Sequence, residues 1–458
     1  MSEISGMNRR ELLALSGALA AATIAGCTGD GQGSPATQST TETTAAPPTQ
    51  TTKEPTEEPP NGEPSVDDER LAALASGNAE FALDLHSHLA SEQGGNQFLS
   101  PYSISVALAM TYAGARGNTR EQMEDVLHYT LGEDIHPAFS DLQRSLGKRE
   151  TATDPVDGSE VDAFQLAVAN TLWGREGYPF SEEYLARLEE HYGAGLRRAD
   201  FTGDPEGERT RINDWVADQT EDRIQDLLPP NSISPQTVLV LTNAIYFMAG
   251  WLHEFDPEKT ADGTFTALDG SESTVPLMRQ ELKTQYADLP GAQAVELPYV
   301  GEEVSMVLIL PDEGTFEEYE QNLDASRLFG VFEELRTSIG DLVFPKFEFE
   351  TEVQLSKALS DLGMPAPFGA GADFSGMVAG GDGGLHIDEV FHKSFVSVDE
   401  EGTEAAAATG VLVEDSLPPS WGELRFDRPF LFAIRDRPTD AVLFLGRVVD
   451  AGAAQGSE

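Results

Sequence analysis

Two pairs of histidines lie close enough in the sequence to raise the question of a metal site. His86 and His88 are two residues apart, and His386 and His392 are six residues apart. The first pair falls within a helical pattern, in which residues two apart point in different directions. The second pair would share one face of a strand and stand roughly 20 Å apart. Neither spacing favours a metal site.

The familiar catalytic patterns are missing from the sequence. Gly-x-Ser-x-Gly, which marks a nucleophile elbow, does not occur. The glycine run at 380–384 lacks the lysine and the helix that a phosphate-binding loop requires. A hydrolytic triad can be assembled from any chain with 8 histidines, so the histidine count carries no weight. These patterns do not support an enzyme, and we expect no metal and no cofactor.

The most unusual segment is 399–416, which reads DEEGTEAAAATGVLVEDS. Between Gly402 and Val411 almost every side chain is small, and Glu404 is the lone charged residue. Alanine has the highest helix propensity, so composition alone favours a helix. The alternative is a mobile segment that later enters a packed sheet. Local sequence leaves both open.

The net charge limits the partners of this chain. It carries 79 acidic and 29 basic residues, for a formal charge of −50. A phosphate backbone requires the opposite sign, so nucleic acid is not an expected partner. Acidic residues spread along the whole chain indicate a surface kept soluble at very high salt, and we expect a halophilic protein. The alternative is an acidic protein from an ordinary cell.

The first 27 residues are typical of an exported lipoprotein. Arg9 and Arg10 precede an apolar run at 12–25 that is too short to span a bilayer, and they resemble a twin-arginine signal. The run ends in a lipobox-like sequence whose last residue, Cys27, is the only cysteine of the chain. We expect Cys27 to be lipidated, which would place the protein outside the cell on a membrane anchor. The alternative is an N-terminal helix with an incidental cysteine.

The rest of the chain divides into a tether and a folded part. Residues 28–65 are rich in Thr, Pro, Gly, Ser, Gln and Glu and are predicted to be disordered. Residues 66–452 form the predicted folded domain. Helical patterns occupy 70–89, a segment that opens at Ser100 and Pro101, 181–192 and 209–228. Strand patterns occupy 161–173, 237–248, 294–299, 304–310, 341–349, 390–398, 423–426, 430–434 and 442–449. Helices first and strands later predict an α+β fold with large mixed or antiparallel sheets.

A series of short motifs follows in order along nearly the whole folded part. They are NQFLSPYSI at 96–104, AGARGNT at 113–119, INDWV at 212–216, LTNAIYF at 241–247 with Trp251 beyond it, FPKF at 344–347, LGM at 362–364, DFSG at 373–376, HKS at 392–394, RPFLF at 428–432 and GRV at 446–448. Each motif is weak alone, but in this order they resemble the serpin family of serine protease inhibitors.

The resemblance implies a role for the small-residue segment. It would be the hinge of a reactive-centre loop that enters the main sheet as a new central strand after a protease cleaves it. The implied hinge residues are Glu400, Gly402, Thr403, Glu404, Ala405, Ala406, Ala407, Ala408 and Thr409. Alternate residues of a strand share a face, so Thr403, Ala405, Ala407 and Thr409 would point inward and the charged Glu404 outward. Glycine at 402 supplies backbone freedom for the bend.

The resemblance also implies a polar cluster, the shutter, beneath the strands that must part. Its residues here would be Ser100, Ser103, Asn243 and His392. Trp251 and Glu400 match the region where insertion begins, called the breach. The simpler interpretation of these residues is ordinary buried polar packing, and the two interpretations are compatible.

Counting along the implied loop places the scissile bond between Ser416 and Leu417. This loop is about two residues longer than in some members of the family, so cleavage between Asp415 and Ser416 stays open. Cleavage after Ser416 fits an elastase-like or subtilisin-like serine protease, cleavage after Asp415 an acid-specific one, and cleavage after Leu417 a chymotrypsin-like or subtilisin-like one. No arginine or lysine lies between 402 and 420, so a trypsin-like target is not expected.

The implied activity is suicide inhibition of extracellular serine endopeptidases by a monomer that catalyses nothing itself. The alternative is a non-inhibitory serpin that acts as a binding or scaffold protein. The two differ in outcome, because only the inhibitor traps its protease as a covalent complex.

Overall fold

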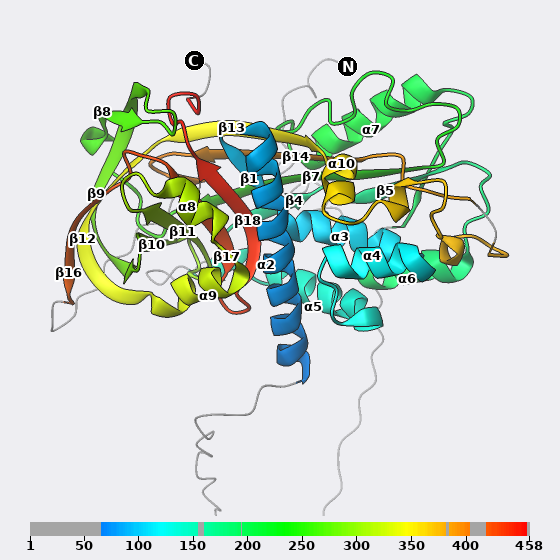
Figure 1. Cartoon of the computed structure of the whole chain (residues 1–458), viewed down its shortest axis with the longest axis horizontal. Coiled ribbons are helices and arrows are strands. Elements are labelled where there is room, and N and C mark those ends of the chain that lie inside the picture. The colour runs from blue at the N-terminus through cyan, green and yellow to red at the C-terminus, as the bar shows by residue number, and fades with distance from the viewer. Residues whose placement is uncertain (1–65, 154–159, 194, 382–383, 404–417, 456–458) are drawn as a thin grey trace, which may run out of the picture. The chain divides into compact units, whose positions relative to one another are not determined.

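The computed structural model describes residues 66–153, 160–193, 195–381, 384–403 and 418–455. In it the long helix α2 (Val66–Gln93) runs between two groups of elements (Figure 1). In this view most strands of a larger sheet lie to its left, with helices α8 (Phe316–Gln321) and α9 (Ala325–Glu334). To its right lie four helices: α3 (Pro101–Tyr112), α4 (Gly117–Val126), α5 (Ile135–Gly147) and α6 (Glu182–Tyr192). Above these helices run the long strands of a second sheet, β7 (Leu239–Gly250), β13 (Phe347–Gln354) and β14 (Val390–Val398).

Three of the four predicted helices, at 70–89, from Ser100 and at 181–192, are present, whereas five of the helices given below were not predicted. Ser100 caps α3 by accepting the backbone N–H of Ser103, and Pro101 occupies the first turn. Helix α6 follows Ser181 and covers the predicted segment. The remaining described helices are α3 (Pro101–Tyr112), α4 (Gly117–Val126), α5 (Ile135–Gly147), α6 (Glu182–Tyr192), α7 (Pro205–Gln219), α8 (Phe316–Gln321), α9 (Ala325–Glu334) and α10 (Leu355–Asp361), with short 3₁₀ turns at Gly132–Asp134, Pro257–Lys259, Ala366–Phe368 and Ser375–Met377.

The larger sheet has 9 strands among the described residues, in the order β1-β18-β17-β11-β10-β9-β12-β16, with β8 paired to β9. Most neighbours are antiparallel, whereas β12 and β16 are parallel. The strands are β1 (Gln97–Leu99), β8 (Ala261–Thr266), β9 (Glu272–Leu289), β10 (Ala292–Pro298), β11 (Val304–Pro311), β12 (Arg336–Pro345), β16 (Ser420–Arg425), β17 (Phe430–Asp436) and β18 (Ala441–Val448). This sheet is built mainly from the C-terminal half of the chain.

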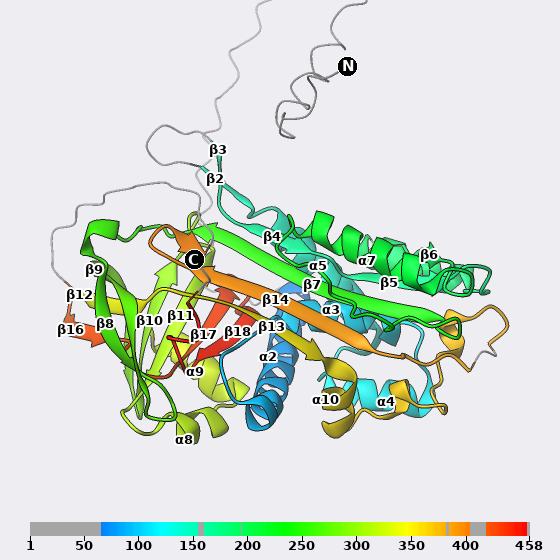
Figure 2. The same ribbon diagram turned by 90° about the horizontal axis from the view of Figure 1, so that it is seen from above.

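The second sheet includes the start of the small-residue segment as one of its strands. Its described strands run in the order β13-β14-β15-β7-β5-β6, with β4 also paired to β7. They are β4 (Gln165–Val168), β5 (Thr171–Arg175), β6 (Arg197–Ala199), β7 (Leu239–Gly250), β13 (Phe347–Gln354), β14 (Val390–Val398) and β15 (Gly402–Thr403); a separate hairpin joins β2 (Thr151–Thr153) and β3 (Glu160–Asp162). Figure 2 shows β7 and β14 running side by side along the sheet.

The central strands β14 and β7 are parallel and pair directly over only part of their length. Val390 pairs with Leu241, and the register continues to Phe395 and Tyr246. Beyond that point the two residues of β15 lie between the strands: both pair antiparallel with β7, and Thr403 also pairs antiparallel with β14. The sheet is therefore closed at one end and wedged open at the other.

The helix predicted at 209–228 is wrong in its second half. Helix α7 begins with the cap Asp204 and ends at Gln219. Glu221 and Asp222 then have φ angles of 50° and 63°, which a right-handed helix cannot contain. The buried side chains that suggested a continued helix instead belong to turns: Ile224, Leu227 and Leu228 pack beneath α7.

Two predicted strands are divided in the structure. The segment 161–173 forms β3, β4 and β5, and the last two hold one register on β7 that is interrupted next to Asn170. The segment 341–349 breaks at Lys346, where the chain leaves the larger sheet as β12 and enters the second sheet as β13. Both breaks fall at polar residues whose side chains lie at the candidate site described below. The strands β1, β2, β6, β8 and β9 were not predicted, and β9, with 18 residues, is the longest of them.

The α+β class is confirmed. A large apolar core joins α2 and α3 to both sheets and includes Phe81, Phe98, Phe247 and Phe444. Within the described ranges, none of the helices combines the length and apolar character needed to cross a bilayer. The predicted signal at 1–27, Cys27 and the tether at 28–65 lie outside the described residues.

Candidate functional site

The beginning of the small-residue segment lies inside the second sheet. Thr403 pairs with Val398 of β14 on one side and with Ala249 of β7 on the other, and Gly402 pairs with Gly250. Both residues of β15 are buried. Residues 404–417 lie outside the described ranges, so the helix and strand alternatives for Glu404 to Thr409, and the bonds at Asp415, Ser416 and Leu417, are not addressed by the structure.

Gly402 is required by the space available to it. A Cβ atom at this position would approach the carbonyl oxygen of Ala249 to 2.2 Å and the Cα of Gly250 to 2.7 Å. Both are backbone atoms, which cannot move aside as a flexible side chain can. The predicted reason for this glycine was freedom to bend; the structure adds close approach to β7 as a second reason.

Thr403 is held by an aromatic pair under the sheet. Only 1% of Thr403 is exposed, and its hydroxyl lies 2.8 Å from the hydroxyl of Tyr299. The ring of Tyr299 stacks on Trp251, with centroids 4.7 Å apart and planes within 8°. Burial raises the pKa of the Tyr299 hydroxyl, so it stays protonated and can donate to Thr403. The pocket for the first inward side chain is thus polar at one point and aromatic around it.

Trp251 also holds the turn that precedes β15, whose residues Gly402 and Thr403 form the wedge between β14 and β7. Its indole Nε1 donates to the carbonyl oxygen of Asp399 at 3.0 Å, and its backbone N–H donates to Glu401 at 2.9 Å. The carboxylate of Asp399 accepts the backbone N–H groups of Glu401 and Gly402. These bonds fix the direction in which the chain enters the sheet.

Glu400 forms a half-enclosed ion pair at the same end of the sheet. Its carboxylate accepts hydrogen bonds from Lys346 Nζ and from the hydroxyl of Thr260, each at 2.6 Å. Burial by itself would raise the pKa of Glu400, but these hydrogen bonds, a backbone hydrogen bond and the charge of Lys346 together outweigh burial and lower the pKa below its usual value. Glu400 therefore ties the turn to the β12–β13 junction and to the segment before β8.

A polar cluster lies deeper in the sheet, where β14 and β7 are still paired. Asn243 Nδ2 donates to Ser103 Oγ at 2.7 Å and to Asn170 Oδ1 at 2.6 Å. His392 Nδ1 bonds to Asn243 Oδ1, and the backbones of these two residues are register partners. Because the amide nitrogen of Asn243 is used as a donor, its oxygen accepts, and the His392 proton resides on Nδ1. Together these side chains join β7, β14, α3 and the β4–β5 connection.

His392 is neutral in this cluster. It is fully buried, and desolvation lowers its pKa to about 3. Its Nε2 has no hydrogen-bond partner among the described residues. Ser100 lies beside the cluster rather than within it: its hydroxyl donates to Leu443 at 2.7 Å and accepts the N–H of Ser103.

The structure separates the predicted residues into two groups. Trp251, Glu400, Gly402 and Thr403 lie around the wedge, whereas Ser103, Asn243 and His392 form the deeper cluster. Sequence reasoning gave no role to four residues of these groups: Asn170, Tyr299, Thr260 and Lys346. Asn170 had one available signal, because it is a polar residue within an otherwise strand-like run. Lys346 lies within the FPKF motif, which marks the family but not the partner of the lysine.

The histidine pairs considered first are divided between separate environments. His86 is buried and its Nε2 lies 2.9 Å from Glu320, whose carboxylate is also bound by Arg447. His88 faces away from it, toward Glu92 and Asp361. His386 lies in a loop and pairs with Asp388, whereas His392 is buried and bonds to Asn243 in the polar cluster.

These features define a class of protein in which the start of a small-residue segment already separates two central parallel strands of a mixed sheet. The family model for serpins, described as serine protease inhibitor, matches residues 76–451, and the chain belongs to the serpin family. An uncharacterized serpin-like protein of Thermococcus kodakarensis is 40% identical over 374 residues, covering 81% of this chain and 84% of that protein. The leukocyte elastase inhibitor of Sus scrofa is 39% identical over 386 residues, covering 82% of this chain and 98% of that protein. The structure of uncleaved ovalbumin matches with a TM-score of 0.72 at 28% identity, covering 82% of this chain and all of that one.

Proposed function

We propose that this protein is an extracellular suicide inhibitor of serine endopeptidases. The observation that carries the proposal is the burial of Gly402 and Thr403 between β14 and β7. In the segment that would have to become a central strand, Thr403 is already paired on both sides and Gly402 is paired with β7. After cleavage the rest of the segment would follow, carrying the acylated protease with it.

The register of the wedge indicates where each later residue would go. Thr403 is opposite Ala249 on β7 and Val398 on β14. Six residues further along an antiparallel strand, Thr409 would meet Asn243 on one side and His392 on the other. These two residues now pair directly with each other. Insertion would therefore place a threonine hydroxyl within the polar cluster, where the bond between Asn243 and His392 must be broken.

The side chains of the segment suit this register. Thr403 points into the core, so the inward positions of an extended strand would be Ala405, Ala407 and Thr409. All are small, and none carries a charge that would need desolvation. Glu404 would face outward. A new strand between β14 and β7 would also pair its backbone groups with both neighbours, which supplies the driving force for insertion.

The target is proposed from the loop residues. Cleavage at Ser416–Leu417 would suit a secreted subtilisin-like or elastase-like protease. The similarity to the leukocyte elastase inhibitor is consistent with such a target. We further propose that lipidation at Cys27 anchors a monomeric inhibitor on the outer surface of a halophilic cell. The charge of −50 is compatible with work at high salt.

A denaturing gel tests the proposal. The protein is incubated with a subtilisin-like protease in concentrated salt, then boiled in detergent. An inhibitor gives a covalent band that contains both chains, and mass spectrometry of the released peptide locates the bond. Clean cleavage with an active protease, for several serine proteases, would favour the binding or scaffold alternative.

A hinge variant links the band to insertion. Thr403→Arg places a charge where 1% of the native side chain is exposed and is expected to convert the inhibitor into a substrate. Thr237→Arg, at a buried position before β7, serves as a control for general destabilisation. Stoichiometric inhibition by the Thr403→Arg variant would contradict the insertion mechanism.

A further inference from the structure

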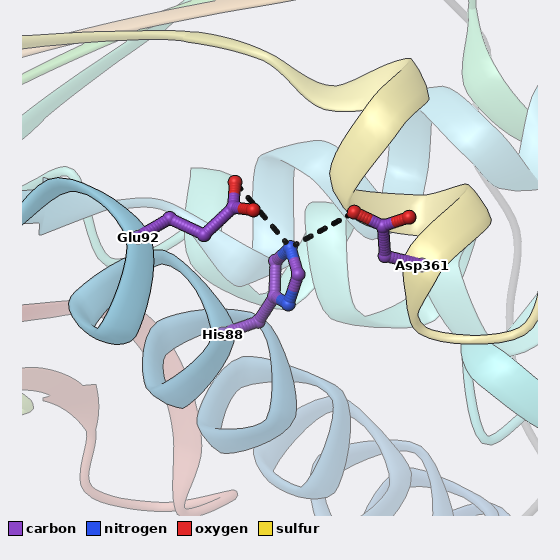
Figure 3. Close-up of side chains that lie close together, drawn as sticks. All are labelled: His88, Glu92 and Asp361. Atoms are coloured by element: carbon purple, nitrogen blue, oxygen red, sulfur yellow. Dashed lines mark ion pairs between the residues drawn. The ribbon is translucent and has the colours of Figure 1, made fainter.

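We propose that His88, Glu92 and Asp361 form a binding site for a divalent transition-metal ion such as Zn²⁺. His88 and Glu92 are one turn apart on α2, and Asp361 is the last residue of α10. Figure 3 shows the two carboxylates converging on the imidazole from opposite sides. One ligand atom from each residue lies within 4.8 Å of the other two.

The spacing of the donor atoms fits a metal better than it fits hydrogen bonds. His88 Nε2 lies 3.9 Å from Glu92 Oε2 and 3.8 Å from Asp361 Oδ2. Both distances exceed the length of a hydrogen bond. Around tetrahedral Zn²⁺, with ligands at about 2.0–2.2 Å, neighbouring donor atoms are roughly 3.4 Å apart. Each of the two distances to the imidazole would have to shorten by about half an ångström, the two carboxylates lie within 4.8 Å of each other, and both of their side chains are exposed enough to move.

The imidazole nitrogen of His88 lacks a hydrogen-bond partner among the described residues. Solvent does not reach His88 Nε2, and it makes no hydrogen bond to the described residues. A polar atom withdrawn from water without a partner is costly, and a metal ion would supply the missing bond. A neutral imidazole with two carboxylates suits Zn²⁺ or another late first-row ion, whereas Mg²⁺ and Ca²⁺ favour oxygen ligands alone.

Lys357 is the present cation of the cluster and would compete with the metal. Its Nζ lies 2.8 Å from Glu92 Oε1 and 2.6 Å from Asp361 Oδ2, and these hydrogen bonds raise the pKa of Lys357. Its side chain is 66% exposed, so it can swing into solvent at little steric cost. Lys357 therefore sets the affinity of the site: removing it should strengthen metal binding.

The chain contains a matched control in His128. This histidine also contacts two carboxylates, but both of its ring nitrogens are engaged, Nδ1 with Glu80 at 3.0 Å and Nε2 with Asp84 at 2.9 Å. It has no nitrogen left to offer a metal without breaking an ion pair. The difference between His88 and His128 isolates the unpartnered nitrogen as the feature that matters.

Metal binding would join two elements that are distant in the sequence. Helix α10 directly follows β13, the neighbour of β14, and a metal would tie it to α2. An ion that binds only the folded protein raises its melting temperature. The expected consequence is a rise in the melting temperature with Zn²⁺ that depends on His88.

Titration with Co²⁺ and Zn²⁺ tests the site in the full-length protein at high salt. We expect one Co²⁺ with the visible absorption of tetrahedral coordination, displaced by Zn²⁺. His88→Gln should weaken binding by roughly tenfold or more and remove the absorption band. Lys357→Met should strengthen metal binding. His128→Gln should leave the metal affinity and the absorption band unchanged. Asp361→Asn serves as a second ligand variant.

The outcomes separate a metal site from a salt-bridge network. Equal Co²⁺ spectra for wild type and His88→Gln would assign binding to surface carboxylates and overturn the proposal. Weaker binding by Lys357→Met would also overturn it, because the lysine would then organise the site rather than compete for it. Melting temperatures without metal confirm that each variant is folded.

Discussion

The hydroxyl groups of Thr403 and Tyr299 lie 2.8 Å apart in the interior, although the residues are separated by 104 positions in the chain. This bond fixes the first inward side chain of the hinge on an aromatic platform that Trp251 completes. It shows how the wedge between β14 and β7 is held before any cleavage takes place.

Removing one hydroxyl of this pair should destabilise the folded protein. Tyr299→Phe leaves Thr403 buried without its partner and should cost about 1–2 kcal/mol in the free energy of unfolding. Thr403→Val should cost a similar amount, and the double variant less than the sum. Denaturant unfolding of the four proteins measures the coupling. Strictly additive effects would mean that the two hydroxyls do not interact.

Replacing Gly402 should expel the wedge. A Cβ 2.2 Å from the carbonyl oxygen of Ala249 forces β15 away from β7, so Gly402→Ala should cost roughly 1–3 kcal/mol. Non-target proteases should then cut the segment after 403 faster than in wild type. Gly330→Ala in α9 is the control, since an added Cβ there meets nothing within 4 Å. Equal digestion rates for both variants would argue against the wedge.

The ion pair of Glu400 should contribute stability that is lost in acid. The pKa of Glu400 is lowered on folding, so its contribution is complete above the unfolded value of about 4.5 and disappears as the pH falls through the folded value. Glu400→Gln should therefore be less stable than wild type at neutral pH and similar to it in strong acid. Chemical denaturation at several pH values tests this sign. A difference that grows on acidification would contradict it.

His392 should make the protein sensitive to acid over a higher pH range. Its pKa falls from 6.5 to about 3 on folding, so only the unfolded chain takes up this proton between those values. Stability should decline as the pH drops through that window, by about 3 kcal/mol at pH 4. His392→Gln should show a shallower decline, whereas His386→Gln, at a half-exposed position, should retain the wild-type slope. If the stability of all three proteins depended on pH with the same slope, a group other than His392 would take up this proton.

Much of the fold could be predicted from local patterns. The α3 cap at Ser100, the strand Val390–Val398 and the buried strand near 239–250 follow from capping chemistry and from runs of apolar residues. The failures have specific causes. The 209–228 helix was extended too far because turns can bury Ile224, Leu227 and Leu228 at helix-like spacing. The strands at 161–173 and 341–349 were joined across Asn170 and Lys346, where tertiary partners interrupt the pairing.

By itself the sequence determined the family, the α+β class and the small inward side of the hinge, because motif order, periodicity and composition are local properties. Only the tertiary structure decided that Thr403 is already buried against Tyr299, that Asn170 joins the polar cluster, and that Glu400 pairs with Lys346. The residues of each such pair lie dozens of positions apart or more, and they meet only when two sheets and a helix pack together. A local sequence pattern does not show which buried polar groups will bond to each other. Burial leaves each group only the partners that the packed fold places within reach.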